Sequence, residues 1–123
     1  MGPISLVTGD RIRGRRTDTS VAVSYPKSRL AVEYETPVPY PNPAANYRGY
    51  VEDDQQSPSL RHLAYVGSVG GRAALVIRLH ADSNRSNPAS VEFVLHGMRI
   101  AVIGFQPAST LLRVADSIAR GSG

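Results

Sequence analysis

Five side chains able to bind anions or move protons fall on one face of a predicted sheet: Arg78, His80, Glu92, His96 and Arg99. Guanidinium groups bind phosphate and carboxylate groups, and imidazoles can hold a metal or a proton. At about 3.3 Å per residue, His80 and His96 lie too far apart to share a metal ion. We therefore expect no metal site. The face is either an open, solvated surface or a broad basic surface that contacts an anionic partner.

A second group of arginines lies near the start of the chain, at Arg11, Arg13, Arg15 and Arg16. Such a cluster could contact nucleic acid or an acidic protein surface, because arginine is well suited to both phosphate and carboxylate. The alternative is the charged edge of a hairpin, where like charges prevent pairing with other chains.

Composition excludes several kinds of site. The chain has 123 residues, a formal net charge of +4 and no cysteine, so disulfides, thiolate zinc sites and cysteine nucleophiles are excluded. No apolar run approaches the ~20 residues of a membrane span, and no basic leader precedes an apolar stretch. Gly67–Gly71 lacks the lysine and the helix of a phosphate-binding loop. We expect no cofactor, and the sequence leaves the compartment undetermined.

Most of the chain reads as strands. Apolar residues alternate with polar ones over Val21–Tyr25 and Leu30–Glu35, which predicts an antiparallel hairpin. Further strands are expected over Leu60–Val66, Ala73–Ala81 and Val91–Phe105. The last of these is broken by a turn at Gly97-Met98, where a leading glycine suits a type II′ turn.

Matching the apolar patterns predicts the register of these strands. Placing Ile77 opposite Phe93 also places Leu75 opposite Leu95 and Leu79 opposite Val91. The same register sets Arg78 opposite Glu92 as an ion pair across the strands. On the next strand, Phe93 would face Val102 and Leu95 would face Ile100, which extends one apolar face.

A C-terminal helix is predicted to cover that apolar face. Leu111, Ala115 and Ile118 recur at helical spacing, Pro107 suits the first turn, and Gly121 can end the helix. We expect the opposite face of the sheet to stay open, because one helix cannot cover both.

The segment Thr36–Ser59 reads as an extended, proline-rich arm. Four prolines at alternate positions exclude a helix or central strand across Pro37–Pro43. Aromatic side chains in the arm imply that it lies on its own domain or on a neighbouring subunit. The expected subunit contacts are Pro39, Tyr40, Tyr47 and Tyr50.

Together these patterns predict one α+β, mostly β domain over residues 1–123. It is an antiparallel meander sheet with a C-terminal helix on its apolar face, an N-terminal hairpin and a long arm over residues 36–59. The layout favours a non-catalytic structural or assembly protein that forms a homo-oligomer and contacts nucleic acid or an acidic protein. One alternative is a small envelope or secreted module that binds an apolar ligand. Another is a small hydrolase or isomerase with a cavity between sheet and helix.

Overall fold

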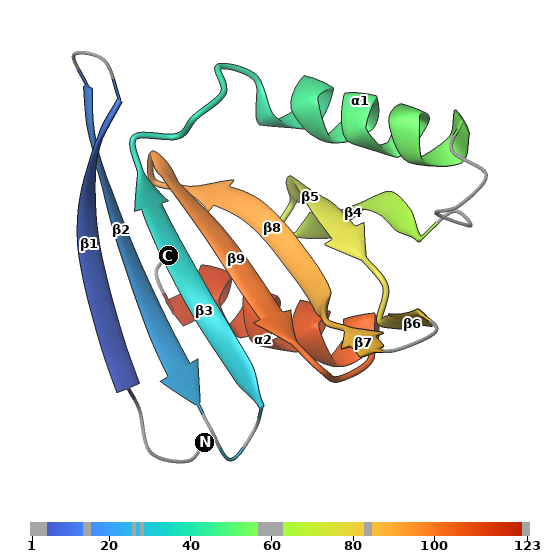
Figure 1. Ribbon diagram of the computed structural model, residues 1–123. Helices are drawn as coiled ribbons and strands as arrows, with labels where there is room; N and C mark the ends of the chain where they lie inside the picture. Colours follow the sequence, from blue (N-terminus) through green and yellow to red (C-terminus); the bar gives the residue numbers. More distant parts are fainter. Residues whose placement is uncertain are drawn as a thin grey trace.

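The computed structural model describes residues 5–13, 16–25, 27, 29–56, 63–82 and 85–121, with side chains described at 20–25, 27, 29–56, 63–80 and 87–121. Seven antiparallel strands form one sheet (Figure 1), in the spatial order β1 (Ser5–Arg13), β2 (Arg16–Tyr25), β3 (Leu30–Thr36), β9 (Met98–Gly104), β8 (Ala89–Leu95), β5 (Arg72–Ile77) and β4 (Ala64–Val69). A small separate hairpin joins β6 (His80–Asp82) to β7 (Arg85–Asn87).

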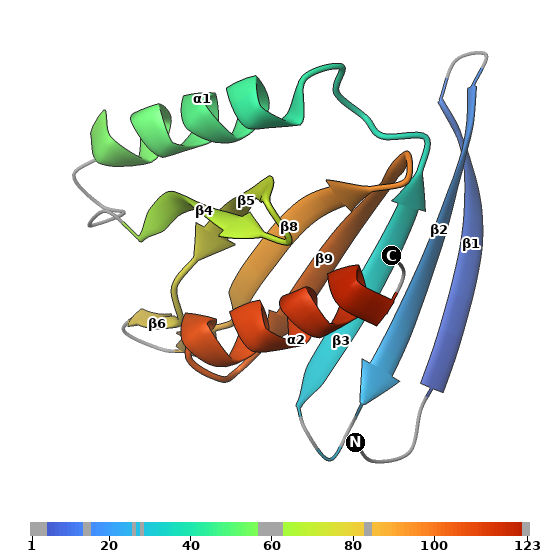
Figure 2. The ribbon, with the colours of Figure 1, turned by 180° about the vertical axis from the view of Figure 1, so that it is seen from behind.

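Two helices cover opposite faces of the sheet. Helix α1 (Pro43–Gln56) lies over β4 and β5, and helix α2 (Ala108–Gly121) lies on the other face against β8, β9 and β4 (Figures 1 and 2). The fold is therefore the predicted α+β, mostly β arrangement with a C-terminal helix on an antiparallel sheet. Helix α1 was not predicted from the sequence.

The core under α2 is the predicted apolar face. Phe93 and Leu111 are fully buried there, together with valines from several strands. The helix presents Leu111, Ala115 and Ala119 to the sheet at positions i, i+4 and i+8, so one stripe of the helix is buried. Burying a side chain such as Phe93 contributes on the order of 2 kcal/mol before conformational entropy is subtracted.

The register between β5 and β8 differs from the prediction. Val76 pairs with Val91, and Leu75 pairs with Glu92, so Ile77 faces Ser90 rather than Phe93. The difference from the predicted pairing is three residues, and an odd shift exchanges the two faces of a strand. Strand β5 ends at Ile77, so the predicted Arg78–Glu92 strand pair does not form.

The shift is possible because β5 is buried on both faces. Val76 packs in the α2 core, whereas Leu75 packs under α1 against Tyr47 and Ala64. Three consecutive residues of β5, Ala74 to Val76, are buried. An apolar strand covered on both sides has no polar face, so its pattern alone cannot set its register.

The turn between β8 and β9 also differs from the prediction. Leu95 pairs with Met98, which leaves His96 and Gly97 as the two-residue loop. Both residues have positive φ, 52° and 73°, as a type I′ turn requires. Phe93 therefore faces Ile100 and Val91 faces Val102, a shift of two residues that keeps the predicted apolar face.

Most of the predicted arm is helix α1. The side chain of Asn42 caps the helix, since its Oδ1 accepts a hydrogen bond of 3.1 Å from the Ala45 N–H. Pro43 then takes the first helical position, where its missing N–H has no partner to lose. Only Pro37–Asn42 is irregular, so the prediction of an extended arm is wrong from Pro43 to Gln56. Residues 57–59 lie outside the described part.

Candidate functional site

A polar network joins the sheet to the start of α1. The Arg99 guanidinium donates from Nη2 to Oε1 of Glu92 at 2.8 Å, and its Nη1 lies 3.9 Å from Oε1 of Glu35. The Tyr40 hydroxyl donates to the other oxygen of Glu92. The hydroxyl of Tyr47 lies 2.9 Å from that of Tyr40, whose own proton is used by Glu92, so Tyr47 is the donor.

Burial sets the titration of these groups. It raises the pKa of Tyr47 to about 12, and it raises the pKa of Tyr40 further, helped by the hydrogen bond to Glu92. For Arg99, burial alone would lower the pKa, but the hydrogen bond and charge of Glu92 and the charge of Glu35 raise it. The network thus holds neutral tyrosines and a fixed ion pair. It fastens α1 to β8 and β9.

Charge is divided unevenly between the interior and the surface. Of the eight basic side chains described, seven are exposed, and Arg99 is the exception. Only two of the seven described carboxylates are exposed, Glu52 and Asp53. The exposed positions of the described part therefore carry an excess of positive charge, seven basic side chains against two acidic ones. The exposed basic residues are Lys27, Arg29, Arg48, Arg72, Arg78, Arg113 and Arg120.

Three of these arginines gather where α2 passes the β4–β5 turn. A recess of about 630 Å³ is lined by Gly70, Arg113, Asp116, Ser117 and Arg120, and we call it the basic recess. The Gly70 N–H donates to Oδ1 of Asp116 at 3.3 Å, which fixes the turn against the helix. Arg72 borders the recess, since its Nη1 donates to the carbonyl of Gly70 at 3.1 Å.

The structure does not bring the predicted basic face together. Arg78 follows β5, where its guanidinium stacks 4.6 Å from the ring centre of Tyr65. His80 begins β6, with Nδ1 3.2 Å from the carbonyl oxygen of Arg78. His96 lies in the turn at the far end of β8, and Arg99 is held between carboxylates. The expected open face is covered over β4 and β5 by α1.

The N-terminal arginine cluster lies on the edge hairpin. Arg11 and Arg13 belong to β1, and Arg16 begins β2. Their side chains, and Arg15 altogether, are outside the described part. Their role remains the prediction made from the sequence.

The predicted subunit contacts divide into two groups. Tyr47 is fully buried in its own chain and Tyr40 is half-buried beside it, with the two rings edge to face at 5.7 Å. These two tyrosines therefore hold α1 on its own sheet. Tyr50 is 46% exposed and Pro39 is exposed, so both lie at the surface.

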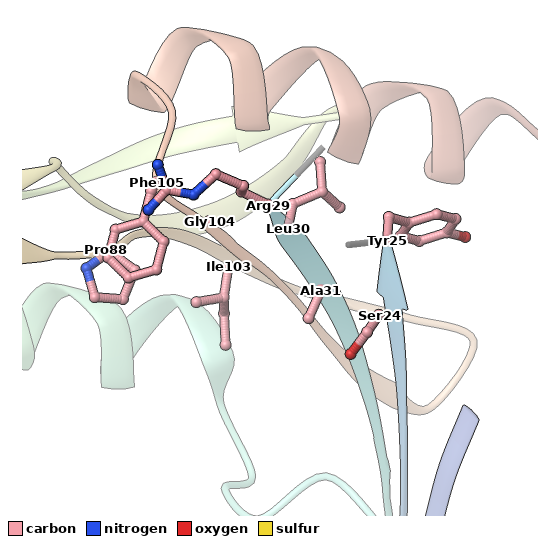
Figure 3. Close-up of a pocket in the computed structure, with 9 residues that line it drawn as sticks. All are labelled: Ser24, Tyr25, Arg29, Leu30, Ala31, Pro88, Ile103, Gly104 and Phe105. Atoms are coloured by element: carbon pink, nitrogen blue, oxygen red, sulfur yellow. The ribbon is translucent and has the colours of Figure 1, made fainter. Parts of the chain in front are cut away.

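An apolar groove of about 460 Å³ opens at one end of the sheet (Figure 3). Ser24, Ala31 and Ile103 form its floor, because they are neighbours across β2, β3 and β9. Pro88 and Phe105 lie at one end, and the Arg29 guanidinium sits 5.0 Å from the centre of the Phe105 ring.

Sequence reasoning did not find Arg113 and Arg120, although a signal was available. They fall seven residues apart on α2, on the side opposite Leu111 and Ala115, so a helical projection places them together on the exposed face. The network around Arg99 gave no such signal, because Glu35, Tyr40 and Glu92 come from three separate segments.

Across the ranges given above, no group of three or more histidine and acidic side chains is arranged to hold a metal ion. Within the same described ranges, neither α1 nor α2 is long and apolar enough to cross a membrane. No family model matches the chain, and neither the curated proteins nor the solved structures include a significant match.

Proposed function

We propose that this is a non-catalytic assembly protein that self-associates and contacts a polyanion, with nucleic acid as the first candidate and an acidic protein as the second. The observation that carries the proposal is the division of charge. In the described part of the chain, six arginines and one lysine are exposed against two carboxylates, and most of the other carboxylates are buried or bonded. A surface of this kind attracts an anionic polymer through many weak phosphate contacts rather than through one catalytic pocket.

Exposed aromatic side chains support the self-association. Phe105 is 41% exposed and Tyr50 is 46% exposed, on different parts of the surface. Large apolar side chains at a surface are common where two proteins meet. Exposed aromatic side chains at two separate places would allow one copy to contact more than one neighbour.

The test uses the wild-type chain. Size-exclusion chromatography with light scattering measures the number of subunits, and fluorescence anisotropy with a labelled duplex DNA measures binding at low and high salt. We expect an oligomer whose affinity for the duplex falls steeply as salt increases. A monomer that ignores both the duplex and an acidic polypeptide would overturn the proposal.

The apolar groove favours a second candidate function, the binding of a small apolar ligand. Its volume lies within the range of small-molecule sites, and apolar side chains line most of it. The space between the sheet and α2 is unsuitable, because Phe93, Val102 and Leu111 fill it. Native mass spectrometry of the purified protein should then reveal a bound molecule that is lost in Ala31→Phe, which fills the floor of the groove.

A further inference from the structure

We infer that the basic recess beside α2 is where the phosphate backbone of a nucleic acid binds. This inference rests on the proposed function and assigns that function to one surface. The recess combines two exposed arginines, a hydroxyl and a neighbouring third arginine in one concave place. Phosphate oxygens are bound by these groups in proteins, and such contacts fix the position of a strand without reading its sequence.

The spacing of α2 aligns the donors. Ser109, Arg113, Ser117 and Arg120 are all exposed, and they follow one another at intervals of four, four and three residues. At 1.5 Å per residue, Arg113 and Arg120 stand about 10 Å apart along the helix axis. Two guanidinium groups at this spacing, with a hydroxyl between them, can contact separate phosphates along one strand.

The β4–β5 turn brings the third arginine to the same place. A Cβ atom added to Gly70 would lie 3.1 Å from Arg72 Nη1 and 3.2 Å from the Cβ of Ala119. The β4–β5 turn therefore brings Arg72 close to the last part of α2. Gly70 has a φ of 56° and a methyl group there would meet both neighbours, which favours glycine at this contact.

The arginines of the recess remain available to a ligand. No hydrogen bond or ion pair joins Arg113 or Arg120 to another residue whose side chain is described. The one carboxylate of the recess, Asp116, accepts the hydrogen bond from the Gly70 N–H. Three positive charges therefore face one negative charge that is already bonded to the backbone.

A duplex is favoured over an acidic protein because the recess is open and its charges are spread along a helix. An acidic helix or loop would need its carboxylates placed at matching points, whereas the phosphates of a duplex present a regular row of charge on every strand. The proposal is therefore committed to a sequence-independent backbone contact.

The experiment compares two matched pairs of substitutions by fluorescence anisotropy with a labelled mixed-sequence duplex DNA at several salt concentrations. R113Q/R120Q removes the two arginines that line the recess and leaves the neighbouring Arg72. R29Q/R48Q removes two exposed arginines from other places, the groove and α1. We expect R113Q/R120Q to weaken binding about tenfold or more and to flatten the plot of log affinity against log salt by about 2, the loss of two phosphate contacts. R29Q/R48Q should change both values much less.

A second pair of variants keeps every arginine. Ser117→Glu adds a negative charge inside the recess, and Gln55→Glu adds the same charge on the exposed part of α1. We expect only Ser117→Glu to weaken binding, with both variants melting near the wild-type temperature.

Each outcome decides something. If the duplex binds the wild type and all four variants bind it equally weakly, the assignment of binding to the basic recess is wrong and the proposed function stands. If the wild type ignores the duplex and binds polyglutamate, the assignment to nucleic acid is wrong. If it binds neither polymer, the recess and the polyanion-binding part of the proposed function both fall.

Discussion

The guanidinium of Arg99 on β9 and the carboxylate of Glu92 on β8 form a hydrogen-bonded ion pair, with 2.8 Å between Nη2 and Oε1. The pair lies on the same face of the sheet as α1. Glu92 is the centre of this network, because its second oxygen accepts the hydroxyl of Tyr40 from the segment before α1. One carboxylate thus joins β8 to its hairpin partner β9 and to the segment before α1, which is 52 residues away in the sequence. Removing its charge should loosen all three.

Glu92→Gln tests the ion pair. The substitution keeps the size of the side chain but leaves the half-buried Arg99 with Glu35, 3.9 Å away, as its one counter-charge among the described side chains. We expect the free energy of unfolding to fall by about 1–3 kcal/mol, measured by urea denaturation. Glu52→Gln, at an exposed site on α1, is the control and should stay within about 0.5 kcal/mol of wild type. Equal effects of the two substitutions would contradict the assigned role.

The raised pKa of Tyr47 predicts a loss of stability in alkaline solution. Burial raises this pKa from 10.0 to about 12, so the unfolded chain releases the hydroxyl proton at lower pH than the folded chain does. The stabilising effect is complete below pH 10 and disappears as the pH rises toward 12. In Tyr47→Phe, stability should fall less over this interval, as measured by denaturation at several pH values. Tyr50→Phe, which alters an exposed ring, should follow the wild-type curve.

Asp54 and its neighbour Asp53 should contribute very differently to the stability of the fold. Its side chain is 2% exposed and Oδ2 accepts a hydrogen bond of 3.1 Å from the backbone N–H of Ala64, which ties the end of α1 to β4. Asp54→Ala leaves that buried donor without its acceptor, so the free energy of unfolding should drop by about 1–3 kcal/mol. Asp53→Ala makes the same change at an exposed position and should have little effect. The idea fails if both substitutions cost the same.

Two glycines should respond to alanine in opposite directions. Gly97 has a φ of 73° in the β8–β9 turn, a conformation that strains an alanine by about 1–2 kcal/mol. Gly49 lies inside α1 with open space where a Cβ would stand, so alanine there should stabilise by about 0.5–1 kcal/mol. Thermal denaturation of Gly97→Ala and Gly49→Ala measures both effects. A stabilised Gly97→Ala would contradict the turn conformation.

The sequence predicted the α2 side of the fold and missed the α1 side. The alternation around Phe93 and the helical spacing of Leu111 and Ala115 are strong periodic signals, and the structure confirms both. Helix α1 has a weak signal, since its surface is polar on most sides and prolines precede it. The start of α1 could nevertheless be predicted, because Asn42 is a common N-cap residue and Pro43 is favoured at the first position of a helix.

The errors in β5 and in the site follow from missing α1. Without a second helix, Leu75 and Ile77 need the same cover as Phe93, and that requirement gave the wrong register. The same omission left Arg99 on an expected open surface, although Glu92 and Tyr40 hold it. Partners such as these depend on long-range packing, which the spacing of residues within one strand does not record.

Helix α2 follows in the sequence every strand that it covers. While the chain is being synthesised, Phe93 and Val102 therefore leave the ribosome before the residues that shield them from water. Until α2 emerges, chains with this apolar face exposed are prone to associate with one another. We expect a chaperone that holds exposed hydrophobic segments to raise the yield of folded protein, and a chain that stops at Pro107 to precipitate.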